Sequence, residues 1–505
     1  MAKIQYDYTK PARTRMAPSP TGELHLGTLR TILYNYALAR RTGGKFLFRI
    51  EDTDEKRAVE GSIDRLLDGT LAFGIDWDEG PRKGGDYGPY YQLEREKAGI
   101  YKKEYDRLLS EDKVYRCFCS EERLVQMREE MKASGKAPMY DRLCRNLSQE
   151  EIDQNLKEGK PYTIRIKIPL NQKLEYVDPM RGKMSWNTSD INDYVLVKSN
   201  NVPTYHGAVV IDDYLMKITH VFRGAEYISS IPVYVLLAQF LGYEPPILIH
   251  PSVLLSPVGK GKMSKRKNGE LVFARVYLDK GYPPQAVLNF LMFLGWSHPD
   301  EKVNILSLED FCKVFSLERL QPQPSKADFA KIDWYGGQYI RMMSLDELFN
   351  NINNWISNIS NEELKKSAEV WIDRIKLEPV HFNKVLALLQ DRLRKYSDMF
   401  ELGEFFYSLP VYDSTFDWTK TNHDELECKA VIQGLNKELS AVVENNGWTQ
   451  EKWEKAIRDF SEICGWKHGD MFMLLRLCIV GSPYSPNLLD SMNLLGAEEC
   501  LNRMA

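Results

Sequence analysis

RTRMAPSPTGELHLGTLRT, residues 13–31, combines a short apolar strand, a loop and the first turns of a helix. We predict the strand at residues 13–19 and the helix at residues 28–41. The apolar residues that recur at helical spacing along one face of this helix are Leu29, Ile32, Leu33, Tyr36 and Ala37. A second apolar strand, KFLFRI at residues 45–50, ends in the acidic run EDTDE. A strand, loop, helix and strand in this order indicate the start of a Rossmann-type, doubly wound α/β domain.

The sequence changes character after this first unit. Residues 113–200 are predicted to be an α+β insertion, with a charged helix at 120–133 and an alternating strand, YTIRIKIP, at 162–169. Residues 203–223 return to apolar runs, GAVVIDD and ITHVF, which we expect to be strands. ILIHPSVLL is expected to be one further strand before a loop rich in glycine and lysine. After residue 275, amphipathic patterns separated by polar turns predict an all-α body.

Composition sets the broad class of protein. The 505 residues are 43% apolar and 27% charged, which is typical of a globular protein with several buried cores. The net charge of −4 excludes an overall basic surface, so any nucleic-acid surface must be local. The beginning of the sequence lacks the features of a secretory signal. The apolar runs at 231–242 and 285–296 are shorter than the ~20 residues that a membrane span needs, and we interpret them as buried helices. We therefore expect a cytoplasmic protein without a membrane partner.

The loop that precedes the first helix has the composition of an anion-binding turn. A helix N-terminus offers free backbone N–H groups and the positive end of the helix dipole, which suit a phosphate. His25 can donate a hydrogen bond to a phosphoryl oxygen, and Gly27 lets a flat ring approach the backbone. Pro18 stiffens the entry to the loop, and Gly22 permits the turn. The alternative is an ordinary surface loop that contains His-x-Gly by chance.

A second loop, GKGKMSKRKNG at residues 259–269, concentrates positive charge between glycines. Its cationic residues are Lys260, Lys262, Lys265, Arg266 and Lys267. Positioned lysine and arginine side chains stabilise the charge that develops on transferring phosphoryl groups. The alternative is a run of charges that is simply solvated.

Together the two loops resemble the paired nucleotide motifs of class I aminoacyl-tRNA synthetases. They read His25-Leu26-Gly27-Thr28 and Lys262-Met263-Ser264-Lys265-Arg266, where Thr28 and Arg266 depart from the general class I pattern but are ordinary in the glutamate branch. Further segments narrow the resemblance to the bacterial glutamyl-tRNA synthetases. These segments are RTRMAPSPTGELHLGTLRT, FRIEDTDEKR, WDEGPRKGGDYGPYYQLER, VPTYHGAVVIDDYLMKITHVFRGAEY, KMSKRKNG and WYGGQYIR, with Leu93 and Ala225 as departures from the branch.

The resemblance implies a division of the chain into domains. A Rossmann catalytic domain would occupy 1–112 and 201–255, interrupted at 113–200 by a connective domain that binds the acceptor end of tRNA. Residues 256–340 would form a stem-contact domain that carries the second loop, and 341–505 a helical anticodon-binding domain. The family is monomeric by default, and its partners are tRNA-Glu and L-glutamate.

The resemblance also implies a pocket for glutamate. An arginine fork can bind both oxygens of a carboxylate, so Arg223 is expected to hold the substrate side chain with help from Arg15. Ser19 and Tyr205 would add hydrogen bonds, Ala17 would line the pocket, and Glu51 would take the α-ammonium. Glutamine would leave a buried guanidinium unpaired, and sites of this kind can reject a neutral analogue by ~10⁴-fold.

The expected reaction needs no protein nucleophile. The substrate α-carboxylate would attack the α-phosphorus of ATP, and glutamate would then pass to the 3′-terminal ribose of tRNA. His25 and Lys265 are the main expected catalytic residues, supported by Lys262 and Arg266, with Mg²⁺ on the phosphates. The residues expected to bind ATP are Pro18, Gly22, His25, Gly27, Lys262, Ser264 and Lys265.

Three of the eight cysteines lie close together in the sequence: Cys117, Cys119 and Cys144. Thiolates suit tetrahedral zinc, and the cluster resembles the zinc site of some bacterial glutamyl-tRNA synthetases. Some of those relatives offer a histidine where this chain has Asn146, so Tyr140 is our candidate for the fourth ligand. The alternative is a group of reduced cysteines without a metal.

The helical body is expected to bind RNA, with Arg392, Arg394 and Lys395 as candidates against the alternative of plain solvent-facing charges. Other functions remain open. A non-discriminating synthetase that also charges tRNA-Gln is the main alternative and is compatible with the sequence. A catalytically silent tRNA-binding relative would not need both nucleotide loops. A glutaminyl-tRNA synthetase usually carries β-barrel anticodon domains, and a glutamyl-queuosine synthetase or a small adenylyltransferase would be shorter.

Overall fold

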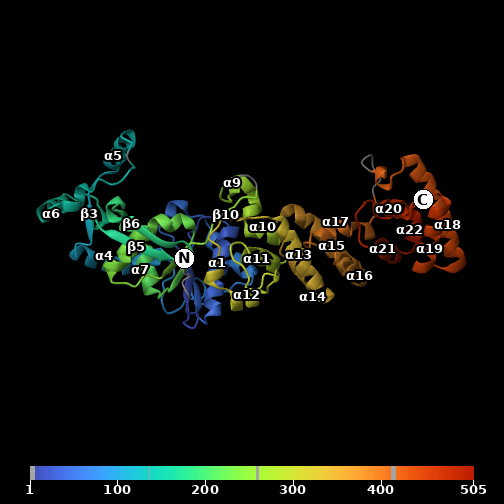
Figure 1. The fold of residues 1–505 in the computed structure, drawn as a ribbon, viewed down its shortest axis with the longest axis horizontal. Helices are drawn as coiled ribbons and strands as arrows, with labels where there is room; N and C mark the ends of the chain where they lie inside the picture. Colours follow the sequence, from blue (N-terminus) through green and yellow to red (C-terminus); the bar gives the residue numbers. More distant parts are fainter. Residues whose placement is uncertain (1–5, 136, 258–260, 411–416) are drawn as a thin grey trace. The chain divides into compact units, whose positions relative to one another are not determined.

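The computed structural model describes residues 6–135, 137–257, 261–410 and 417–505 (Figure 1). The chain divides into two compact units, which we name by number. Unit 1 comprises Met1–Arg275 and Leu288–Phe329, and unit 2 comprises Val276–Val287 and Ala330–Ala505. The finer domain boundaries expected from the sequence stay predictions. No described helix is long and apolar enough to cross a membrane.

A parallel four-stranded sheet forms the centre of unit 1. Its strands, in spatial order, are β2 (Lys45–Phe48), β1 (Arg13–Met16), β8 (His220–Phe222) and β9 (Ile247–Ile249). Strands that are neighbours in space but distant in sequence require crossover connections, as in doubly wound folds. The Rossmann-type α/β class predicted from residues 13–50 is therefore confirmed. In such sheets, ligands bind at the carboxyl ends of the strands, where the loops after β1, β2, β8 and β9 meet.

Helix α1 (Leu26–Arg41) follows β1 directly and packs against the sheet. Four of the five residues expected on its apolar face, Leu29, Ile32, Leu33 and Ala37, are fully buried. Arg40 and Arg41 lie in its last turn, where positive charge interacts favourably with the helix dipole. Further helices that begin in unit 1 are α2 (Ser62–Ala72), α3 (Gln92–Lys97), α4 (Ile100–Ser110), α8 (Ile231–Leu241), α9 (Lys265–Asn268), α10 (Ala274–Asp279) and α12 (Leu308–Val314). Helix α11 (Pro284–Met292) begins in unit 2.

The prediction of a strand at GAVVIDD is wrong, because these residues belong to helix α7 (Tyr205–Leu215). Thr204 begins the helix by accepting a hydrogen bond from the backbone N–H of Gly207 at 3.4 Å. Every residue from 207 to 213 is buried. A segment buried on all sides shows no amphipathic period, so a buried helix and a buried strand look alike in the sequence.

ILIHPSVLL also differs from the expectation, since it forms two strands rather than one. β9 ends at Ile249, and the short strand β10 (Leu254–Leu255) pairs with β11 (Ser325–Lys326). Pro251 lies between them and has no backbone N–H to continue a ladder. The break lets His250 turn away from the sheet and become part of the site described below.

The predicted α+β insertion is present (Figure 1). An antiparallel sheet contains β3 (Val114–Cys117), β4 (Thr163–Ile166) and β7 (Val195–Val197). A separate hairpin contains β5 (Lys173–Asp178) and β6 (Gly182–Asn187). The charged helix and the alternating strand are confirmed as α5 (Glu121–Ala133) and β4, and α6 (Gln149–Lys157) follows a capping box at Ser148.

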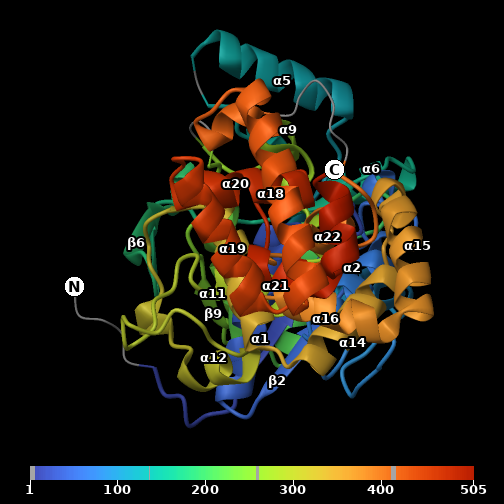
Figure 2. The same cartoon turned by 90° about the vertical axis from the view of Figure 1, so that its right-hand side faces the viewer.

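Unit 2 is helical, as predicted. Its helices beyond α11 are α13 (Ala330–Met342), α14 (Leu345–Ser357), α15 (Glu362–Leu377), α16 (Pro379–Leu389), α17 (Asp398–Leu402), α18 (Glu425–Asn446), α19 (Gln450–Ile463), α20 (His468–Val480), α21 (Leu488–Leu495) and α22 (Ala497–Arg503). Helices α14 to α17 surround one apolar core that includes Trp371 and Phe382. Helices α18 to α22 surround a second core around Trp453 and Leu474, and Figure 2 shows them side by side in orange and red.

Candidate active site and metal centre

The loop after β1 places His25 at the N-cap of α1. Its Nδ1 accepts a hydrogen bond from the backbone N–H of Gly27 at 3.1 Å. Burial lowers the pKa of His25, and the nearby charge of Lys262 lowers it further. The imidazole is therefore neutral near pH 7, with its proton on Nε2. That N–H and the free amides of the helix N-terminus can donate together to one anion.

The Lys-rich loop is held against β10 by backbone contacts. The N–H of Met263 donates to the carbonyl of Leu254 at 2.8 Å. Lys262 and Leu255 form an isolated antiparallel β-bridge. Lys262 Nζ lies 3.0 Å from a carboxylate oxygen of Glu226. Burial tends to raise the pKa of Glu226, but backbone hydrogen bonding and Lys262 outweigh it and lower that pKa. Lys260, which the sequence analysis included in this loop, lies outside the described residues.

A cavity of about 700 Å³ lies between these two loops. The residues expected to bind ATP that line it are His25, Gly27, Lys262, Ser264 and Lys265. Pro18, Gly22 and Arg266 do not line it. Pro18 instead accepts a hydrogen bond from the backbone of Glu51, Gly22 adopts a φ of 147°, and Arg266 is exposed on α9. The cavity thus combines a helix N-terminus with lysines, which matches the charge of a polyphosphate.

Arg223 lies on the wall of the same cavity, after β8. Only 5% of the residue is exposed. Its Nε donates to His250 Nε2 at 2.9 Å, and its Nη1 donates to the Tyr205 hydroxyl at 3.4 Å. Its Nη2 is buried without a hydrogen-bond partner, and among the described residues Arg223 forms no ion pair. A buried guanidinium with a free donor is suited to receive a carboxylate from a ligand.

The second arginine of the expected pocket is arranged differently. Arg15 donates to both oxygens of Asp213, at 3.0 and 2.9 Å. Arg49 also contacts Asp213, at 2.6 Å, and donates to Glu51 at 3.1 Å. Burial tends to raise the pKa of Asp213, but the two arginines outweigh it and hold that pKa well below its ordinary value. The positive charge of Arg15 is therefore already balanced by Asp213.

Glu51 lines a neighbouring cavity of about 220 Å³ together with Ser19 and Tyr205. Burial raises the pKa of the Glu51 carboxyl, although Arg49 and Arg15 oppose the shift. Burial also raises the pKa of Tyr205 to about 12, so its hydroxyl stays protonated at neutral pH. Because Tyr205 bonds to Arg223, this cavity adjoins the first one. Ala17 is half-buried in the loop between β1 and Ser19.

Sequence reasoning did not identify several charged residues of the site. Arg49 and Asp213 form the buried ion-pair network, Glu226 contacts the Lys-rich loop, and Asp178 and His250 lie behind Arg223. A signal was available for the first two, since each is a charged residue inside an otherwise apolar run. Asp178 and His250 gave none, because only the fold brings them to Arg223.

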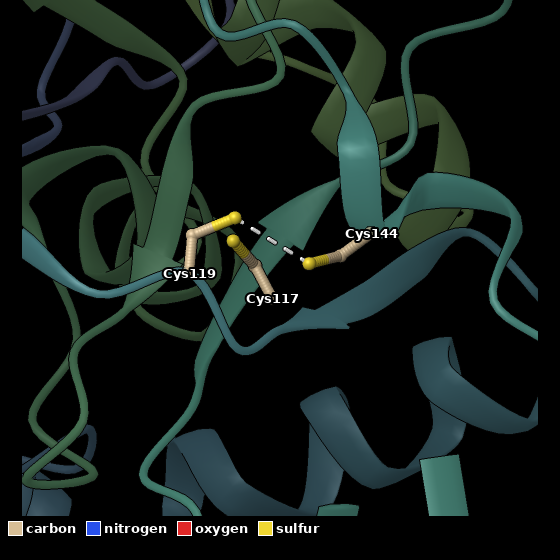
Figure 3. A group of neighbouring side chains, drawn as sticks. All are labelled: Cys117, Cys119 and Cys144. Carbon is tan, nitrogen blue, oxygen red and sulfur yellow. Dashed lines mark hydrogen bonds between the residues drawn. The ribbon is translucent and has the colours of Figure 1, made fainter. Parts of the chain in front are cut away.

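The three clustered cysteines meet in the insertion (Figure 3). Their Sγ atoms all lie within 4.8 Å of one another, and Cys119 and Cys144 are 3.6 Å apart. The Tyr140 hydroxyl lies 3.3 Å from Cys117 Sγ and 3.4 Å from Cys119 Sγ. Zn–S bonds of about 2.3 Å in a tetrahedron separate the sulfurs by about 3.8 Å. The three sulfurs are therefore compatible with one zinc ion, and the Tyr140 hydroxyl lies beside them.

Unit 2 has a cavity of its own, of about 430 Å³, lined by four basic residues and by the acidic residues Asp333, Asp398 and Glu401. Arg392, Arg394, Arg476 and Tyr484 are among the residues that line it. The side chains of Arg392 and Arg394 are exposed. Lys395 also lines the cavity, but it forms an ion pair with Asp398. Of the three RNA-binding candidates, Arg392 and Arg394 therefore have exposed guanidinium groups, and Lys395 is already paired with Asp398.

Comparison with known proteins places these sites in a family. The family model described as "tRNA synthetases class I (E and Q), catalytic domain" matches residues 11–334, and that of an "Anticodon binding domain" matches residues 347–505. A glutamate–tRNA ligase from Dehalococcoides mccartyi is 38% identical over 500 residues, which are 98% of this chain and 98% of the relative. One from Geobacillus stearothermophilus is 36% identical over 496 residues, with 98% of both chains covered.

Solved structures agree with the sequence relatives. The glutamate–tRNA ligase of Elizabethkingia meningosepticum, crystallised with its amino acid, superposes with a TM-score of 0.83 at 33% identity and covers 98% of both chains. The glutamate–tRNA synthetase of Elizabethkingia anophelis gives the same TM-score at 34% identity, covering 98% of this chain and 99% of the other. The resemblance found in the nucleotide loops thus extends over the whole chain. The chain belongs to the bacterial glutamate–tRNA ligase family of class I tRNA synthetases.

Proposed function

We propose that this chain activates L-glutamate with ATP and transfers it to the 3′ end of tRNA-Glu. The observation that carries the proposal is Arg223, a buried guanidinium with a free Nη2 on the wall of a cavity that also holds His25 and Lys262. An anion-binding helix end and a carboxylate-binding arginine within one cavity suit a reaction between a carboxylate and a polyphosphate. The reaction belongs in the cytoplasm, where charged tRNA is used, with the chain acting as a monomer.

In this proposal, ATP binds with its phosphates between the N-terminus of α1 and the Lys-rich loop. His25 donates from Nε2 to a phosphoryl oxygen, and Lys262 and Lys265 face the phosphates across the cavity. Lys262 must leave Glu226 to make this contact, which is an exchange of one carboxylate partner for a phosphate. Mg²⁺ on the phosphates would neutralise part of their charge.

Glutamate binds with its side-chain carboxylate at Arg223 and its α-ammonium toward Glu51. Tyr205 and Ser19 add hydrogen bonds. The α-carboxylate oxygen then attacks the α-phosphorus, the bond to the leaving pyrophosphate breaks, and glutamyl-adenylate forms. In the second step, a hydroxyl of the terminal ribose attacks the carbonyl carbon and AMP leaves. Alignment and charge stabilisation supply the rate, and no protein nucleophile takes part.

The rest of the chain would hold the tRNA. Lysine and arginine contacts to phosphates supply most of the affinity for RNA, and unpaired bases stack on aromatic or guanidinium planes. The unit 2 cavity offers Arg392, Arg394 and Arg476 beside the exposed ring of Tyr484. We assign this cavity to a base of the anticodon, and the insertion to the acceptor end.

We also infer a structural zinc ion in the insertion, held by Cys117, Cys119, Tyr140 and Cys144. The distances among the three sulfurs and the hydroxyl support this ligand set. The guanidinium of Arg165 lies 4.0 Å from the centre of the Tyr140 ring, a cation–π contact that holds the ring beside the three sulfurs. The ion would tie β3 to the segment around Cys144 and so shape the surface offered to tRNA.

Aminoacylation tests the function directly. Purified tRNA-Glu and tRNA-Gln are each incubated with ATP and labelled glutamate or labelled glutamine. Glutamate on tRNA-Glu alone is the expected result. Glutamate on both tRNAs would make the enzyme non-discriminating, and glutamine on either tRNA would overturn the assignment of Arg223.

A further inference from the structure

The hairpin formed by β5 and β6 docks against the catalytic sheet beside the amino-acid pocket. The Tyr176 hydroxyl accepts a hydrogen bond from the backbone N–H of Leu248 at 2.7 Å and donates to its carbonyl at 3.2 Å. Both contacts are made to β9, two residues before His250. The insertion thus contributes a fixed wall behind the pocket as well as a surface for RNA.

Asp178, the last residue of β5, uses its two oxygens for different partners. Oδ1 accepts from the backbone N–H groups of Met180 and Arg181, at 2.7 and 3.0 Å, and so closes the hairpin turn. Oδ2 lies 2.5 Å from Nδ1 of His250. Asp178 and His250 are both fully buried. The turn fixes the carboxylate, which in turn fixes the imidazole.

The hydrogen-bond roles of His250 follow from its two neighbours. Burial lowers the pKa of His250, although the hydrogen bond with Asp178 opposes the shift, so the ring is neutral near pH 7. Its single proton lies on Nδ1 and is donated to Asp178. Nε2 then carries a lone pair and accepts the Nε–H of Arg223 at 2.9 Å. Arg223 therefore donates to His250, and His250 donates to Asp178, so every hydrogen bond pairs one donor with one acceptor.

We propose that Asp178 and His250 are positioning residues that aim the guanidinium of Arg223 at the side-chain carboxylate of glutamate. The inference rests on the proposed function, because it takes Arg223 as the glutamate-binding residue. Neither residue touches the substrate. Asp178 selects the tautomer of His250, and that tautomer holds Arg223 by Nε, which leaves Nη2 without a protein partner.

A neutral partner has an advantage over a carboxylate at this position. Three other buried arginines of unit 1, Arg15, Arg49 and Arg95, each form an ion pair with Asp212 or Asp213. Arg30, which lines the same cavity as Arg223, donates instead to backbone carbonyls. A carboxylate beside Arg223 would neutralise it in the same way and weaken its attraction for a substrate anion. An imidazole fixes the orientation and leaves the positive charge uncompensated until glutamate binds.

The substitution Asp178→Asn inverts the tautomer. The amide oxygen must remain at the turn, where it accepts two backbone N–H groups, so the amide NH₂ faces His250. Nδ1 must then accept, the proton moves to Nε2, and two donors face each other at Arg223. Loss of a hydrogen bond to a charged group predicts a rise of about 10- to 100-fold in the KM for glutamate. The KM for ATP should be unchanged.

The second variant tests the relay by rescue. Glutamine at position 250 offers an amide oxygen to Arg223 without depending on Asp178 for its tautomer. The double variant Asp178→Asn, His250→Gln should therefore recover most of the glutamate affinity that Asp178→Asn loses. The double variant Asp178→Asn, His250→Leu has no acceptor for Arg223 and should not recover the glutamate affinity.

Tyr176→Phe is the matched control, because it weakens the docking of the same hairpin without touching the relay. It should lower the unfolding temperature and leave the ratio of the two KM values unchanged. The relay is overturned if Asp178→Asn leaves the KM for glutamate unchanged, if both KM values rise together, or if Tyr176→Phe reproduces the effect.

A spectroscopic readout separates this inference from the function on which it rests. In protein labelled with ¹⁵N-histidine, the ring shifts of His250 should report a proton on Nδ1 in the wild type and on Nε2 in Asp178→Asn. A tautomer change without any effect of Arg223→Gln on glutamate binding would mean that the relay exists but that Arg223 is not the glutamate ligand. An unchanged tautomer would overturn the relay itself.

Discussion

Replacement of Arg223 by glutamine tests the amino-acid pocket most sharply. Only 5% of the residue is exposed, and among the described residues it lacks an ion-pair partner. In the complex that we propose, the substrate carboxylate is its only counter-charge. Removing one member of a buried, hydrogen-bonded ion pair costs about 3–5 kcal/mol. At about 1.36 kcal/mol for each factor of ten, kcat/KM for glutamate should fall by about 10²- to 10⁴-fold.

The assay is aminoacylation of tRNA-Glu over a range of glutamate, glutamine and ATP concentrations. The substitution should also narrow the difference in kcat/KM between glutamate and glutamine, because glutamine no longer leaves a buried charge unpaired. Arg82→Gln, which removes an exposed arginine paired with Asp64 and Asp68, is the matched control and should behave as wild type. A loss for glutamate below about tenfold, or an equal loss for ATP, would refute the reasoning.

Three further predictions concern other parts of unit 1. His25→Asn keeps an acceptor for the N–H of Gly27 but loses the imidazole Nε2–H that donates to phosphate. The kcat should therefore fall by about 10²- to 10³-fold while the unfolding temperature stays unchanged. A lower unfolding temperature would contradict the assignment. Tyr140→Phe should weaken zinc binding, measured by competition with a chelator, and retention of wild-type affinity would remove Tyr140 from the ligand set. Asp213→Asn leaves Arg15 without its partner and should destabilise the protein by about 3–5 kcal/mol at pH 7. The folded-state pKa of Asp213 is depressed, so the wild-type advantage in urea unfolding should be complete above the ordinary value of 3.8 and shrink as the pH falls below it; an advantage that does not vary with pH would contradict the ion pair.

The parts of the fold that the sequence predicts well are those with a clear apolar period or a clear helix cap. Helix α1 shows its buried face every three or four residues, and α5 begins at a serine cap before a charged, exposed helix. The prediction of a strand over helix α7 is wrong because residues 207–213 of the helix are buried on every side. Burial of that kind results from packing between distant segments, and a local pattern does not contain it.

The site divides in the same way. His25 and Lys262 could be proposed from the sequence because each lies in a short motif whose composition already suits phosphate. Asp178 and His250 could not, since they are 72 positions apart and lie in separate parts of the chain. Their meeting depends on the docking of the hairpin of β5 and β6 on strand β9 of the central sheet. Residues that position a ligand-binding group are generally found only after the fold is known.

The ion pairs of the pocket assign different tasks to its two arginines. Arg15 is held by both oxygens of Asp213, so its charge is balanced before any substrate arrives. It can still offer hydrogen bonds, which a glutamine side chain would accept as readily as a glutamate. Arg223 keeps its charge uncompensated because a neutral imidazole is its nearest partner. We therefore expect the preference for an anionic side chain to come from Arg223, which the carboxylate of Asp178 orients through His250 rather than by direct contact.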